Sequence, residues 1–132
     1  MTEQPSGVTA SYYRCRRSDD FIDTFYDVFL SKSPQIAAKF EKTDFRIQKL
    51  MLRQSLLEML CFDRGVSGTS EEIERLGRTH KELEIRPEMY AMWLDSLCEA
   101  VQQHDPEYTA ELEQLWRAAM QKSIQAMIAA SV

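Results

Sequence analysis

Histidine is rare in this sequence, and one of its two copies stands where it could do chemistry. His80 lies late in a charged segment, a few residues before Arg86 and Pro87 interrupt the helical pattern. Its imidazole could act as a general acid or base, bind zinc, or bind the iron of a haem axially. An exposed or capping histidine near a helix C-terminus is the more ordinary alternative. His104 lies in a predicted solvated corner between helices, and we assign it no role.

The residues around His80 argue against some of these roles and leave others open. Acid–base catalysis also needs a nucleophile, and although Glu82 and Glu84 lie close in sequence, no nucleophile motif accompanies them. We therefore predict no catalytic residue. Zinc needs several protein ligands, and no cluster has that spacing. Haem needs a single imidazole, because the porphyrin supplies the other ligands, and a backbone carbonyl can hold the second ring nitrogen. The local residues leave haem ligation and an ordinary histidine as alternatives.

The elements that position His80 are predicted from helical periodicity. Apolar residues recur at helical spacing along the chain, and no strand-like alternation interrupts them. Pro34, Pro87 and Pro106 each follow a residue that can open a helix, while Gly65 and Gly68 lie in a loop. We predict an all-α domain of six or seven helices. They lie at about 9–17, 18–32, 34–39 (a short turn), 44–62, 70–82, 87–104 and 106–130.

Composition limits the class of protein. A chain of 132 residues makes one domain, and 21 acidic against 16 basic residues argue against a general nucleic-acid-binding protein. The one basic cluster, at 12–17, we interpret as a solvated helix end. Three scattered cysteines favour a reducing cytosol, and neither a signal peptide nor a membrane-spanning run is predicted. We predict a disordered tail at residues 1–8 and a single domain at 9–132.

Several motifs occur together in a fixed order. The aromatic pair Phe25-Tyr26 is followed by a Ser-Pro that opens a short helix, then by Phe40 and by the segment TDFRIQK. Next comes a His-x4-Ile-x-Pro-x2-Tyr arrangement that runs from His80 to Tyr90. In this order and spacing the sequence resembles the bacterial single-domain globins. It is similar, more distantly, to truncated haemoglobins and to the globin domains of flavohaemoglobins.

This resemblance implies a globin fold around haem b, with His80 as the proximal iron ligand. Tyr26 would be the distal tyrosine and Gln48 a distal amide, both on the side where a gas binds. Phe40 would be the corner phenylalanine that packs against the haem face. The other residues implied to line the pocket or contact the cofactor are Phe29, Phe45, Lys49, Leu52, Ile85, Tyr90 and Trp93. The cations that could meet the haem propionates, which we do not rank, are Lys49, Arg53, Arg78 and Arg86.

Departures from the related families also bear on function. The spacing between Phe40 and Gln48 follows the truncated type, whereas flavohaemoglobin spacing would place Leu50 at the distal position. Flavohaemoglobin-type globins pair the tyrosine that matches Tyr90 with a glutamate on the last helix, but residues 128–132 contain none. The tight glycine motifs of truncated globins are absent. An N-terminal helix is retained, so we expect a complete or nearly complete globin.

The resemblance implies reversible binding of dioxygen and of other diatomic gases such as CO and NO. The use could be oxygen binding or transport, gas sensing, or nitric oxide detoxification, which would need an external reductase because this sequence encodes no flavin or nicotinamide domain. A globin-fold regulatory or interaction module without haem is the alternative, and a peroxidase-like activity is a third hypothesis. We expect no nucleic-acid or membrane partner, and the sequence leaves the oligomeric state open.

Overall fold

The computed structural model describes residues 7–131, which form seven α-helices and no strand. This confirms the predicted all-α class. The predicted tail, residues 1–8, overlaps the first helix at Gly7 and Val8, and its residues 1–6 lie outside the described part of the chain. The helices are α1 (Gly7–Arg16), α2 (Phe21–Ser31), α3 (Pro34–Lys39), α4 (Phe45–Asp63), α5 (Thr69–Glu82), α6 (Pro87–His104) and α7 (Ala110–Ala130).

Side-chain caps determine where several of these helices begin. The Ser33 hydroxyl accepts a hydrogen bond from the backbone amide two residues later, just as Pro34 starts α3. Helix α7 begins at Ala110, four residues later than predicted. The reason is that Asp105 accepts the Glu107 amide in a separate turn, and the Thr109 hydroxyl then caps the helix. A proline permits a helix start but does not require one. The prediction that this helix begins at Pro106 was therefore wrong.

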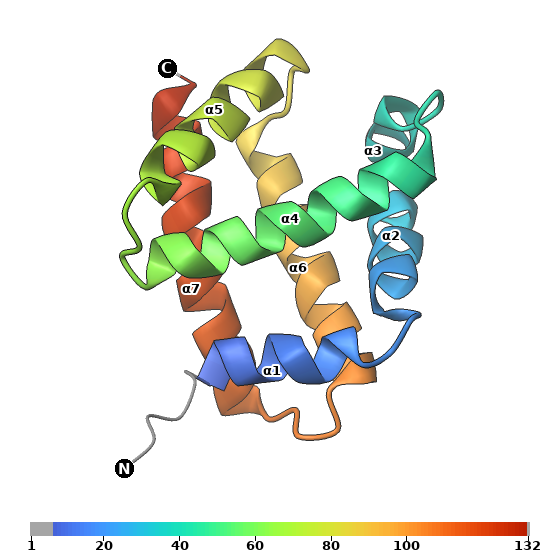
Figure 1. Cartoon of the computed structure of the whole chain (residues 1–132). Coiled ribbons are helices and arrows are strands. Elements are labelled where there is room, and N and C mark those ends of the chain that lie inside the picture. Colours follow the sequence, from blue (N-terminus) through green and yellow to red (C-terminus); the bar gives the residue numbers. More distant parts are fainter. Residues whose placement is uncertain (1–6, 132) are drawn as a thin grey trace.

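Two helix pairs make the most extensive contacts in the molecule. Helix α2 packs against α6, and α5 packs against α7 (Figure 1). Helix α4 crosses in front of α6 and α7 and contacts α5 and α7, while α1 lies across one end of α6 and α7 (Figure 1). The interior between these layers is apolar and includes the fully buried residues Phe25, Leu56, Leu97, Trp116 and Met120. None of the helices in residues 7–131 combines the length and the apolar character that crossing a bilayer requires.

A buried polar network fixes α1 to the corner between α6 and α7. The Trp116 indole donates to the Ser11 hydroxyl at 2.9 Å, and Ser11 donates to Asp105 at 2.5 Å. Arg14 completes the network with two hydrogen bonds to the Asp105 carboxylate, at 2.7 and 2.9 Å. The basic cluster at 12–17 is therefore not wholly a solvated helix end, because Arg14 is largely buried in an ion pair.

Candidate functional site

A cavity of about 360 Å³ lies between α4 on one side and α2, α3, α5 and α6 around it, and two side chains of α7 also line it. Its wall is mainly aromatic and aliphatic, as is usual for cofactor sites. Lys39, Met51, Thr79 and Leu83 line it and are also exposed, so they mark where it opens to solvent. The residues predicted from the sequence that line this cavity are Tyr26, Phe29, Phe40, Gln48, Leu52, His80, Ile85, Tyr90 and Trp93.

Two of the predicted contact residues are not on the cavity wall. Phe45 packs behind it, with its ring centroid 5.4 Å from that of Tyr26 and 5.9 Å from that of Phe40. The ammonium of Lys49 pairs with Asp23 at 2.6 Å. Arg53, Arg78 and Arg86 are exposed and do not line the cavity either.

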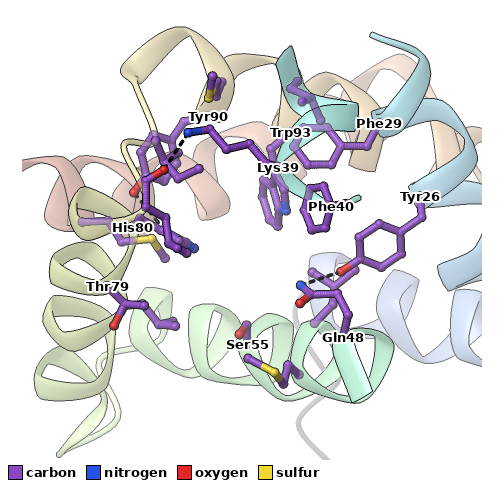
Figure 2. Close-up of a pocket in the computed structure, with 18 of the residues that line it drawn as sticks. Tyr26, Phe29, Lys39, Phe40, Gln48, Ser55, Thr79, His80, Tyr90 and Trp93 are labelled. Carbon is purple, nitrogen blue, oxygen red and sulfur yellow. Dashed lines mark hydrogen bonds between the residues drawn. The ribbon is translucent and has the colours of Figure 1, made fainter. Parts of the chain in front are cut away.

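His80 stands on the last turn of α5, on the wall that faces α4. Helix α5 reaches this position because Gly77, one turn earlier, lies so close to α7 that an added Cβ would overlap the backbone of Met127. The His80 ring points into the cavity (Figure 2). Burial lowers the pKa of His80, so the neutral imidazole is favoured.

The second ring nitrogen of His80 has a side-chain partner. Nδ1 lies 3.0 Å from the Tyr90 hydroxyl on α6. The backbone carbonyl expected there is thus replaced by a phenol. When Nδ1 carries the proton and donates to Tyr90, Nε2 keeps its lone pair on the cavity side and could bind a metal ion.

A second polar pair lies across the open space from His80 (Figure 2). Gln48, in the first turn of α4, donates its amide hydrogen to the Tyr26 hydroxyl at 3.0 Å. The Tyr26 ring is held by edge contacts with Phe25, Phe40 and Phe45, whose centroids lie 5.0 to 5.9 Å from its own. Burial raises the pKa of Tyr26 to about 12, although the Gln48 hydrogen bond works in the opposite direction. The phenol is therefore neutral, and its own proton is free to donate into the cavity.

Sequence reasoning missed several residues of the wall. Lys39 is the most polar of them, and its ammonium donates to the Leu83 carbonyl at 2.8 Å. Ile124 and Met127 contribute to it from α7. The one sequence signal for Lys39 was its place directly before Phe40. The approach of α3 to the corner after α5, which brings it to the wall, is not encoded locally.

Comparisons with known proteins agree with this architecture. The family model described as globin matches residues 23–128. A crystal structure of a Pseudomonas aeruginosa PAO1 protein, described as structurally highly homologous to a human haemoglobin, is 40% identical to this chain with a TM-score of 0.90. The match covers 94% of this chain and 95% of that one. No curated protein matches the chain significantly in sequence. These matches confirm the predicted fold, and the chain belongs to the globin family, whose members generally bind haem.

Proposed function

We propose that this protein binds haem b through His80 and thereby binds dioxygen and other diatomic gases reversibly. One observation carries the proposal: a neutral imidazole and a neutral phenol face each other across an apolar cavity, from α5 and α2. When bound, the haem iron would supply the coordination position that a diatomic gas occupies.

The cavity suits such a group in size and in chemistry. Its volume of about 360 Å³ lies within the range of small-molecule and cofactor sites. Phe40 and Ile85 offer apolar surface to a flat macrocycle, and the exposed residues at the mouth leave room for polar groups at its edge. His80 would hold the iron through its imidazole, which is the one protein ligand that such a group needs.

Tyr26 and Gln48 would act on the gas side. Because Gln48 donates to the Tyr26 oxygen, the tyrosine proton remains available for a ligand in the cavity. A hydrogen bond to a group that carries charge contributes about 1.5–3 kcal/mol, which corresponds to tenfold or more in affinity. The apolar wall around this pair would exclude water. We therefore expect slower gas release than in a pocket without a donor.

Tyr90 would fix the orientation of His80, the proposed proximal ligand. With the proton on Nδ1, which lies 3.0 Å from its hydroxyl, Tyr90 would accept a hydrogen bond and orient the His80 ring, with a neutral phenol in place of a carboxylate. A carboxylate partner would make the imidazole more basic and more electron-donating. The neutral partner supports reversible binding over a peroxidase-like activity. Oxygen transport, gas sensing and nitric oxide detoxification with an external reductase are all compatible with this site.

The visible spectrum of the purified protein, expressed with ample haem, tests the proposal. We expect a Soret band that shifts when CO is added to the reduced form, and we expect His80→Ala to lose it. His104→Ala is the matched control, because His104 lies 2.6 Å from the Thr24 hydroxyl and does not line the cavity. A colourless wild-type protein would favour the module without haem, and full haem retention by His80→Ala would show that another residue is the ligand.

A further inference from the structure

The side chain of Lys39 lies across the mouth of the cavity. Lys39 is the last residue of α3, and its ammonium reaches the carbonyl of Leu83, 44 residues further along the chain, at 2.8 Å. Figure 2 shows its side chain extending from the Phe40 side of the cavity toward the His80 side. It thus joins the two segments that flank the opening.

Within residues 7–131, one lysine lines the cavity. Among the residues described, those that line the cavity include Lys39 but no carboxylate and no arginine. Lys49, which the sequence had suggested as a propionate partner, pairs with Asp23 instead. In the part of the chain that the structure describes, the polar group that the Lys39 ammonium contacts is the neutral carbonyl of Leu83. Such a site favours a ligand with an apolar body and a negative charge at one edge.

We infer that Lys39 binds a carboxylate of the ligand at the cavity mouth and so selects a haem whose propionates are free; the inference rests on the proposed function. In the exchange, the ammonium gives up a neutral carbonyl for a charged acceptor, and charge-assisted hydrogen bonds are the stronger kind. Because Lys39 is exposed, solvent and salt screen the interaction. Its effect on haem retention is therefore modest and salt-dependent.

The test compares haem with haem dimethyl ester, in which both carboxylates are blocked. Each is loaded into the wild-type protein, Lys39→Gln, Lys39→Arg and the control Lys42→Gln, an exposed lysine that does not line the cavity. The rate of transfer to excess apomyoglobin is then measured at low and high salt. Thermal unfolding of each apoprotein verifies that the variants fold.

We expect Lys39→Gln to lose haem roughly three- to tenfold faster than the wild type at low salt, with a smaller difference at high salt. Lys39→Arg and Lys42→Gln should retain haem as the wild type does. The dimethyl ester should leave the wild type and Lys39→Gln at the same rate, because it has no carboxylate to bind.

Two results would overturn the inference while leaving the proposed function intact. If Lys39→Gln speeds the loss of haem and of the ester equally, Lys39 acts by closing the mouth and not by binding a carboxylate. If it changes neither rate, Lys39 has no part in retention. A wild-type protein that retains neither compound would instead overturn the proposed function, and the inference with it.

Discussion

The two polar residues that face each other across the cavity are both kept neutral by burial. Burial lowers the pKa of His80 and raises the pKa of Tyr26 to about 12. A neutral imidazole can offer a lone pair to a metal ion, and a neutral phenol can donate a hydrogen bond. The apolar wall therefore gives both side chains the protonation state that the proposed gas binding would need near neutral pH.

Replacing Tyr26 by Phe removes the donor while keeping the ring that packs against Phe25, Phe40 and Phe45. We expect dioxygen to dissociate about tenfold faster or more from Tyr26→Phe, because a hydrogen bond of about 1.5–3 kcal/mol is lost. Stopped-flow displacement of dioxygen by CO measures this rate. Tyr13→Phe, in an exposed position on α1, is the control. An unchanged rate in Tyr26→Phe would remove this residue from the mechanism.

At the scale of the elements, the close contact between α5 and α7 determines where His80 lies. Gly77 allows the two helices to approach because any side chain there would meet the backbone of Met127. His80 follows Gly77 by three residues, about one turn, so a shift of α5 away from α7 would move the imidazole with it. Met127 also lines the cavity, so the same contact shapes part of its wall.

We expect Gly77→Ala to destabilise the protein by roughly 1–3 kcal/mol, because a rigid backbone and not a flexible side chain occupies the space of the new methyl group. Urea unfolding followed by circular dichroism measures the difference. The adjacent exposed residue provides the control variant Arg78→Ala, which should change stability little. Equal stability of Gly77→Ala and the wild type would contradict the close approach of the two helices.

At the scale of the whole molecule, the Asp105 network connects the N-terminal helix to the corner that begins α7. Burial alone would raise the pKa of Asp105, but hydrogen bonds from Arg14, Ser11 and the Glu107 amide outweigh it and lower the pKa below the usual 3.8. A carboxylate with a depressed pKa in the folded state stabilises that state above the unfolded-state pKa. This stabilisation is lost as pH falls through the folded-state value.

The free energy of unfolding should therefore fall as the pH drops below about 4, and less steeply in Asp105→Asn than in the wild type. At pH 7 we expect this variant to be less stable by about 1–3 kcal/mol, since Arg14 and Ser11 lose a charged acceptor. Urea unfolding at several pH values between 3 and 7 measures both effects. The control is Asp19→Asn, at an exposed position between α1 and α2. Parallel pH profiles for Asp105→Asn and the wild type would contradict the assigned role.

Properties that depend on neighbouring residues could be predicted from the sequence. Helical periodicity and the prolines located the helices and placed His80 at the end of one, because spacing along the chain determines which side chains share a helix face. The order of motifs predicted the globin family and predicted that Tyr26 and Gln48 lie on the same side of the pocket. The late start of α7 was missed because the turn around Asp105 competes with the helix after Pro106.

The tertiary structure alone decided which distant residues meet at the cavity. Lys39 reaches the wall because α3 approaches the corner at Leu83, and Tyr90 takes the place of a backbone carbonyl beside His80 because α6 folds back past α5. Lys49, which the sequence predicted to contact a cofactor, instead forms an ion pair with Asp23. The physical reason is that the face of a helix is determined by residues close together in the sequence. The partner of a residue across a cavity depends on how separate helices pack, and no short sequence pattern predicts that packing.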